Sequence, residues 1–459
     1  MRIPHRSLAG FLLRLAAFAA VLQLAAQPVA AQSILRDAET EKLLQDMMDP
    51  LAEAAGLGRG SVEVVLLQDN SLNAFVAGGQ RIYVHSGLIE AADTANEVQG
   101  VLAHELGHIT GGHVISSDSG AKEATGITII SLLLGVAAMA AGAGDAGMGI
   151  LAAGQQAAMG KYLAFNRGQE SSADAAGVEY LSKAHISGRG SISFFKKLQN
   201  MEFRYGVSQD DEAAYSRTHP MTGDRIVTLE REYQEDPAWN TPPDPVLQQR
   251  FERAKAKLYG YLAGPAETLR RYPAYMTGVP ARYARAYAYH KDAQVDKALA
   301  ETEALVAEDP ADPYFLELQG QILLESGRPR DALDPLRRAT EMSGNAPLIA
   351  TTFGHALIAT EEQGNFEEAA RVLKTAVARD RANPFAWYQL GVVYAAQGDM
   401  PRARLASAEQ QSLSGNTAEA LRSAEAAEMG LPTGSPDWLR AQDIALAAKA
   451  ELEREKKRR

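Results

Sequence analysis

The chain has 459 residues, of which 46% are hydrophobic and 22% are charged, a composition typical of a globular protein with two or three domains. Its formal net charge of -11, with no basic run before Arg454–Arg459, argues against a nucleic-acid partner. Because it contains no cysteine, disulfide bonds and a lipidated cysteine are excluded.

The N-terminus has the pattern of a secretory signal peptide. Arg2, Arg6 and Arg14 accompany an apolar run over residues 8–26, and small residues precede Gln32. We therefore expect an exported protein of the bacterial periplasm, either soluble or peripheral to a membrane. A retained N-terminal anchor is the alternative.

Strands and helices alternate in the following segment, which favours an α+β fold. Residues 61–69 are β-branched and apolar and predict a strand, and two short strand-like runs flank Gly78-Gly79 in a hairpin pattern. Thr94 and Glu97 then have the spacing of a capping box, so we expect a helix from this point through His108.

Residues 126–144 form an uncharged run that is long enough to span a bilayer. Its second half consists largely of Ala and Gly, which contribute little to membrane insertion, and Asp145 follows directly. The run favours a buried or membrane-peripheral helix, and a membrane span and a mobile lid are the alternatives.

Beyond a Pro-rich linker at residues 235–245, the pattern is wholly helical and repeats. An alanine recurs at equivalent positions at intervals of 34, 37 and 34 residues, at Ala298, Ala332, Ala369 and Ala403. A proline and a glycine recur with the matching intervals of 34 and 37 residues, at Pro313, Pro347 and Pro384 and at Gly320, Gly354 and Gly391. This is the tetratricopeptide pattern. We place the three additional residues of the third unit in its inter-helix loop, near residues 360–363.

The stretch "HELGH" has the spacing of a metal-binding motif. His104 and His108 are four positions apart on the expected helix, so their imidazoles lie on one face, about 6 Å apart at Cβ, and can share one metal ion. Two neutral imidazoles suit zinc, and Glu105 is suitably placed to accept a proton from an activated water.

A catalytic zinc needs a third protein ligand. The local pattern H-E-x-x-H-x-x-G-x-x-H fails, because its last histidine position holds Val114 while His113 is one residue early. His113 is instead expected to pack against or orient a ligand. The helix-compatible run 166–181 offers Glu170 as the ligand and, one turn later, Asp174 as an acceptor for the N–H of a ligating imidazole. The alternative for both acids is a solvated helix surface.

Together with "HELGH", the segments "RGQESSAD" (residues 167–174), "NAF" (residues 73–75) and "THP" (residues 218–220) followed by Arg225 resemble the M48 family of zinc metallopeptidases. The resemblance implies a zincin-like domain, mostly helical with a small sheet, before an all-α repeat solenoid. It implies one zinc per chain, held by the imidazoles of "HELGH" and the carboxylate of Glu170. It also implies that His219 can act as a fourth, latching ligand.

The same resemblance assigns Asn73, Ala74 and Phe75 to an edge strand that binds an extended substrate. Arg225 stays open between stabilising an oxyanion and pairing with a surface acid. The predicted organisation is a signal peptide, a peptidase domain, a linker with a connecting helix, about four repeats and capping helices, at residues 1–31, 32–235, 236–277, 278–417 and 418–459.

We therefore expect a periplasmic zinc endopeptidase. The resemblance implies misassembled or stalled outer-membrane proteins as substrates and the outer-membrane assembly machinery as a partner of the repeats. Residues 126–144 are a candidate for peripheral membrane contact. One alternative is a chaperone or adaptor in which zinc is structural, and another is a protease anchored in a membrane by residues 126–144.

Overall fold

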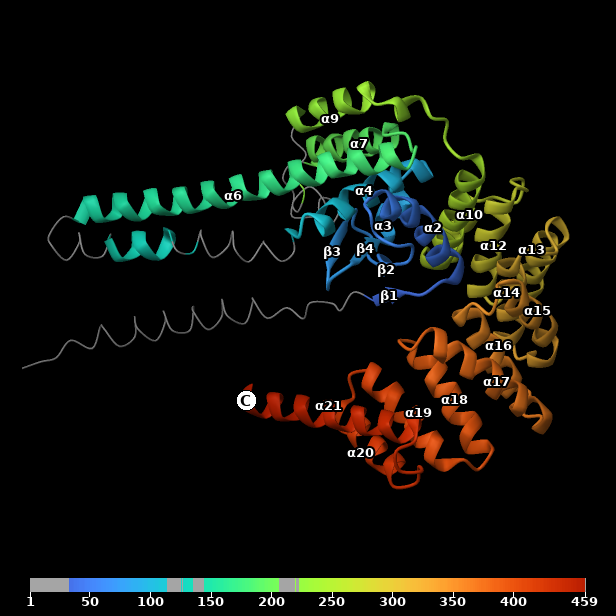
Figure 1. The fold of residues 1–459 in the computed structure, drawn as a ribbon. Helices are drawn as coiled ribbons and strands as arrows, with labels where there is room; N and C mark the ends of the chain where they lie inside the picture. The colour runs from blue at the N-terminus through green and yellow to red at the C-terminus, as the bar shows by residue number, and fades with distance from the viewer. Residues whose placement is uncertain are drawn as a thin grey trace, which may run out of the picture.

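The computed structural model describes residues 33–113, 125, 127–134, 144–205, 219 and 223–458. Helices surround a small sheet in the first part of the chain, and the second part is a curved array of paired helices (Figure 1). The predicted architecture, a mostly helical α+β domain followed by an all-α repeat region, is confirmed. The predicted signal peptide lies outside the described residues.

The sheet contains four strands in the order β1-β2-β4-β3. β1 (Ser33–Leu35) is antiparallel to β2 (Glu63–Gln68), β2 is parallel to β4 (Arg81–His85), and β3 (Ala74–Ala77) is antiparallel to β4. The predicted strand and hairpin are therefore confirmed. β1 and β3 are the two edges of this sheet.

The helices that pack on the sheet include α2 (Ala38–Ala54), α3 (Ser86–Ala91) and α4 (Ala95–Thr110). Beyond them, α6 (Gly144–Lys183) and α7 (Arg189–Tyr205) pack on α4, and α9 (Gly223–Glu235) packs on α6 and α7, followed by the short helix η2 (Pro237–Asn240). As the capping pattern predicts, the side chain of Thr94 accepts a hydrogen bond from the backbone N–H of Glu97, at the start of α4. Almost every residue of α4 is buried, so its polar side chains must find partners inside the protein.

α4 and the second half of α6 approach each other closely. A Cβ atom added at Gly107 would lie 2.6 Å from the backbone oxygen of Ala173, nearer than side chains tolerate, and Ala173 is fully buried. Small residues on both helices therefore bring the "HELGH" stretch against the segment that contains Glu170.

The apolar run 126–144 is described only in part, since residues 126 and 135–143 lie outside the described residues. Residues 127–134 are helical and lie beside α6, where Ser131 meets Gly154 (Figure 1). Their apolar side chains are exposed rather than buried, as Ile130 (59% exposed) and Leu133 (66%) illustrate. Within the described part of the chain, no helix has the length and apolar character that a bilayer crossing requires.

The second part of the chain consists of helix pairs. α10 (Pro245–Leu262) and α11 (Pro265–Arg271) lead into α12 (Val279–Lys291), α13 (Val295–Glu308), α14 (Pro313–Glu325), α15 (Pro329–Met342), α16 (Pro347–Ala359), α17 (Gln363–Arg379), α18 (Pro384–Ala396) and α19 (Met400–Leu413). α20 (Thr417–Glu428) and α21 (Pro436–Arg458) close the array.

Close helix packing explains the repeated small residues. A Cβ atom added at Gly354 of α16 would lie 2.6 Å from Cγ of Leu373 on α17, and Gly320 meets Leu336 in the same way one repeat earlier. The placement of the three additional residues in a loop is wrong. The loop before α17 has three residues like its counterparts, and α17 has 17 residues where α15 and α19 have 14. Three residues are close to one helical turn, so the insertion extends α17 without changing the faces that pack.

A buried charged network joins the two parts of the chain. Arg253 of α10 forms ion pairs with Glu39 of α2 and with Asp312 at the start of α14, and Lys257 forms an ion pair with Asp37. α10 also inserts Phe251 into the core that surrounds the sheet. This helix therefore belongs to both parts and fixes the first repeats against the peptidase-like domain.

Candidate metal centre

The two histidines of "HELGH" face one point in the protein. His104 and His108 lie one turn apart on α4, are 2% and 8% exposed, and have their Nε2 atoms 3.2 Å apart. Because α4 is enclosed by other elements, neither imidazole can turn its Nε2 to solvent without moving the helix.

Glu170 of α6 reaches the same point from a distant position in the sequence. Its carboxylate oxygens lie 3.4 Å from Nε2 of His104 and 3.4 Å from Nε2 of His108. Glu170 is only 7% exposed. Burial alone raises the pKa of this carboxyl, but the three neighbouring histidines hold it well below its usual range.

His219 completes the cluster. Its Nδ1 lies 3.3 Å from Nε2 of His104 and 2.9 Å from Oε1 of Glu170, and the residue is buried. One ligand atom from each of His104, His108, Glu170 and His219 falls within 4.8 Å of all the others. These four residues form a metal-binding cluster.

The spacing of these atoms fits a tetrahedral ion. Ligands that lie about 2.0–2.1 Å from a tetrahedral zinc are about 3.3–3.4 Å from one another. Separations of 3.2 and 3.3 Å between imidazole nitrogens, and of 3.4 Å from the two oxygens of Glu170 to His104 and His108, are close to this value, and the contact of His219 with Glu170 is shorter, at 2.9 Å. Two imidazole nitrogens that face each other without an intervening cation would leave buried lone pairs poorly satisfied.

Glu105 lies beside the cluster but outside the set of ligands. It is 1% exposed, and within the described chain neither of its carboxylate oxygens has a hydrogen-bond partner. Nε2 of His219 lies 3.6 Å from its Oε1. Burial raises the pKa of Glu105, as expected for a group that accepts and releases protons.

Asp174 and Arg225 support the ligands from behind. Oδ1 of Asp174 lies 2.9 Å from Nδ1 of His104, so the carboxylate fixes the ring with Nε2 toward the cluster. Burial lowers the pKa of His104, but Asp174 and Glu170 together raise it to about 9. A metal ion therefore competes with a proton for this imidazole.

Arg225, which the sequence left between an oxyanion role and a surface pair, takes neither position. Its side chain is 10% exposed, with Nη2 2.8 Å from Oδ1 of Asp174 and Nη1 3.0 Å from Oε2 of Glu170. It therefore holds both carboxylates in place and offsets part of their charge. Nothing in the local sequence around Arg225 signals this contact, because it joins α9 to α6.

His113 is not a member of the cluster but contacts one of its ligands, His108. The Nδ1 atoms of the two rings are 2.9 Å apart, so His113 holds Nε2 of His108 toward the other ligands. Burial lowers the pKa of His108 to about 4, which keeps its imidazole neutral. A neutral imidazole is the form that binds a metal ion.

The residues expected to bind substrate lie at one edge of the sheet. Asn73 directly precedes β3, Ala74 is fully buried, and Phe75 stacks on Tyr83 of β4 with ring centroids 5.2 Å apart. β3 pairs with β4 along one side and also contacts α4, the helix that carries two of the ligands. Its other side is an edge of the four-stranded sheet.

Comparison with known proteins identifies the two parts of the chain. Residues 38–233 match Peptidase family M48, and residues 283–347 and 359–412 match the tetratricopeptide repeat. The beta-barrel assembly-enhancing protease of Yersinia pestis is 25% identical over 370 residues, 78% of this chain and 72% of that protein. The corresponding protease of Escherichia coli strain K12 is 24% identical over 379 residues, 81% of this chain and 75% of that protein. Metalloprotease LoiP of the same strain is 31% identical over 159 residues, 34% of this chain and 56% of that protein.

Proposed function

Since this chain belongs to peptidase family M48 through residues 38–233 and carries tetratricopeptide repeats beyond them, we propose that it is a zinc-dependent endopeptidase of the periplasm. The single observation that carries the proposal is the convergence of four buried ligand atoms beside a buried carboxylate that has no hydrogen-bond partner among the described residues. Burying a carboxylate without a hydrogen-bond partner costs free energy of folding, so such a group is typical of a catalytic site.

The residues divide the work of peptide hydrolysis. His104, His108 and Glu170 would hold a zinc ion, which would supply Lewis acidity toward water and the peptide carbonyl. Glu105 accepts the proton of the attacking water and delivers it to the leaving amine. Asp174 and Arg225 keep the ligands oriented during this transfer.

We further propose that His219 is a latch. Its position within 3.3 Å of His104 and 2.9 Å of Glu170 supports a role as fourth ligand that keeps water from the ion. Opening then requires His219 to leave the cluster, and an extended substrate can add to β3 next to Asn73, Ala74 and Phe75.

The relatives named beta-barrel assembly-enhancing protease support misassembled or stalled outer-membrane proteins as the substrates. The repeats are suited to docking these substrates and the assembly machinery, because stacked helix pairs form an extended concave surface. The sequence pattern of residues 1–31 supports export to the periplasm.

Residues 127–134 support peripheral contact with a membrane. Leu132, Leu133 and Leu134 are each more than half exposed, as is Met148 on the facing helix α6. Exposed apolar side chains grouped in this way are typical of interaction surfaces. Extraction of membranes with high salt or carbonate is expected to release the protein. Retention in the membrane after carbonate treatment would favour the anchored alternative.

The catalytic proposal is tested with Glu105→Gln, which keeps the shape of the side chain but removes the base. We expect hydrolysis of an unfolded polypeptide to fall about a thousandfold while zinc content and melting temperature stay unchanged. Glu179→Gln, an exposed carboxylate on α6, is the matched control and should be fully active. If Glu105→Gln retains the entire cellular phenotype, the chaperone or adaptor role is favoured instead.

The latch is tested separately. His219→Ala leaves three protein ligands and opens the fourth position, so we expect zinc to be retained and proteolysis of a test substrate to rise. Loss of activity, or unchanged activity with stoichiometric zinc, would contradict the latch.

A further inference from the structure

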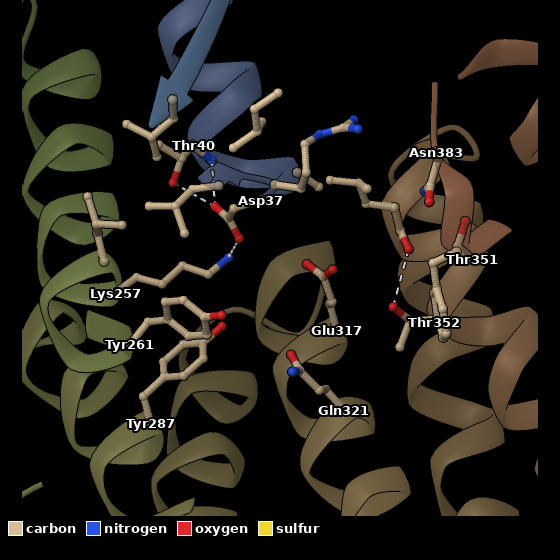
Figure 2. Close-up of a pocket in the computed structure, with 18 of the residues that line it drawn as sticks. Asp37, Thr40, Lys257, Tyr261, Tyr287, Glu317, Gln321, Thr351, Thr352 and Asn383 are labelled. Carbon is tan, nitrogen blue, oxygen red and sulfur yellow. Dashed lines mark hydrogen bonds and ion pairs between the residues drawn. The ribbon is translucent and has the colours of Figure 1, made fainter. Parts of the chain in front are cut away.

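A cavity of about 670 Å³ lies between the concave side of the first repeats and the peptidase domain, apart from the metal centre. Its walls come from β1, β2, α2, α10, α12, α14, α16 and α18, and Figure 2 shows side chains from several of these elements pointing into it. The volume is within the range of ligand-binding sites.

One carboxylate in this cavity has no counter-charge. Glu317 of α14 points into the space between Lys257 and Thr352 (Figure 2). Its Oε2 is buried without a hydrogen-bond partner among the described residues, and Glu317 forms no ion pair with them. A buried polar atom without a hydrogen-bond partner is expected to contact a bound group such as a ligand, an ion or a water molecule.

The other charged side chains of the wall are already paired. Lys257 pairs with Asp37, Arg36 with Glu41 and Asp380, and Glu325 with His290. The cavity therefore contains one acidic group that has no ion-pair partner among the described residues, and the chemistry that fits it is a cation.

The rest of the wall suits a polypeptide rather than a free ion. Large apolar side chains are exposed along it, including Ile34 (56% exposed), Tyr261 (51%) and Phe385 (46%). Gln321 and Thr352 add hydrogen-bonding groups next to them (Figure 2). β1, which borders the cavity, is an edge strand, and edge strands accept extended segments.

We propose that this cavity binds an extended segment of a polypeptide substrate through a lysine or arginine side chain that pairs with Glu317. The inference rests on the proposed function, because it makes the repeats a docking site for what the metal centre cleaves. The carboxylate of Glu317 favours a basic residue in the bound segment, and the apolar wall favours apolar residues next to that basic residue.

The protonation of Glu317 supports this assignment. Burial raises the pKa of Glu317 to about 8, Lys257 opposes the rise, and Asp37, Glu39 and Asp312 add to it. The other titratable groups near the cavity are Tyr287 and Tyr314, whose pKa values Glu317 helps to raise, and His355, which lies beside Glu325. A bound cation supplies the missing positive charge, so binding at neutral pH releases the carboxyl proton of Glu317 to solvent.

The first test measures binding alone. A terminally blocked, fluorescent peptide with one central lysine among leucine and threonine residues is titrated into the full-length Glu105→Gln protein, beside the same peptide with norleucine at the centre. We expect the lysine peptide to bind about tenfold more tightly and to lose this advantage in Glu317→Gln. Calorimetry at neutral pH in two buffers should detect close to one released proton, and none in Glu317→Gln.

Glu325→Gln is the matched control, because it makes the same substitution on the same helix and in the same cavity but at a carboxylate that His290 already pairs. It should bind the lysine peptide nearly as well as the parent protein. Equal affinity for the two peptides, or equal losses in Glu317→Gln and Glu325→Gln, would overturn the proposal.

The second test concerns the substrate. Two fluorogenic substrates share one cleavage segment, and one of them also carries the lysine-centred segment. Glu317→Gln should raise KM for the longer substrate to the value for the shorter one and leave kcat unchanged. An unchanged KM would contradict the assignment to substrate. If neither substrate is cleaved by any variant, the peptidase proposal fails, while the binding titration still decides the cavity.

Discussion

Two clusters of buried charge lie in this molecule, and they are organised in opposite ways. At the metal centre, ligand atoms of His104, His108, Glu170 and His219 converge on one point. At the junction between the two parts of the chain, charges are matched in pairs, as in Arg253 with Glu39 and Asp312.

The difference separates a binding site from a structural joint. A charge whose partner is another side chain is satisfied within the fold, whereas groups of like character that face one another need an additional ion. Glu317 lies near the junction between the two parts of the chain, but it resembles the groups of a binding site, because its Oε2 has no hydrogen-bond partner among the described residues. The predictions below test this distinction, beginning with the largest effect.

Glu170→Ala should empty the metal centre. It removes the carboxylate ligand contributed by α6, so we expect affinity for zinc to fall more than about a hundredfold and added zinc to stop raising the melting temperature. Metal analysis of the purified protein measures the first effect and thermal unfolding the second. Glu179→Gln on the same helix should bind zinc normally, and a Glu170→Ala protein with full zinc content would refute the ligand assignment.

Lys257→Met should weaken the joint. Lys257 is 4% exposed and pairs with Asp37, so removing it leaves a buried carboxylate without its cation and should cost about 3 kcal/mol of the free energy of unfolding. Chemical denaturation measures this cost. Lys183→Met breaks an exposed pair with Glu179 and should change stability by less than about 0.5 kcal/mol. Similar losses in both variants would show that burial does not decide the effect.

Glu317→Gln should stabilise the protein at alkaline pH. The folded protein retains the Glu317 proton up to about pH 8, whereas an exposed carboxyl releases it near pH 4.5, so raising the pH between these values lowers stability. The variant removes this loss and should gain on the order of 2 kcal/mol at pH 9 relative to pH 5. Glu325 has a pKa lowered by His290 and should show the opposite dependence, losing its contribution as the pH falls. A flat difference between wild type and Glu317→Gln across this range would contradict the burial of an ionisable carboxyl.

Gly354→Ala should destabilise the repeats by about 1–3 kcal/mol, because its methyl group would overlap Leu373. Gly364 of α17 has open space at the same atom, so Gly364→Ala should gain about 0.5 kcal/mol from helix propensity. Opposite signs for the two variants in thermal unfolding are expected. Stabilisation by both would contradict the close approach of α16 and α17.

The sequence predicted the local features well, because they depend on near neighbours in the chain. The cap at Thr94, the turn at Gly78-Gly79 and the 34-residue spacing of the repeats each need only a few adjacent residues. The facing of His104 and His108 follows from helix periodicity alone. The additional residues before Ala369 were misplaced because an insertion of about one helical turn leaves the hydrophobic pattern unchanged.

Contacts between segments that are distant in the chain were harder to predict from the sequence. Glu170 was a candidate from the helix-compatible run 166–181 and His219 from the resemblance to a known family, but their distances from His104 required the tertiary structure. His113 was expected to pack against or orient a ligand, and only the structure shows that this ligand is His108. The contacts of Arg225 had no local signal, since they depend on which buried groups lie opposite. The cavity around Glu317 is lined by residues from eight elements and had no counterpart in the sequence pattern.

The order of the residues alone therefore determined which helices and strands form, which side chains carry metal-binding chemistry, and that a repeat array follows. Only the tertiary structure decided which buried charges are paired and which are left facing a ligand. The reason is that helix and turn preferences act over a few residues, whereas the free energy of a buried charge depends on every group within several ångströms, whatever its position in the chain.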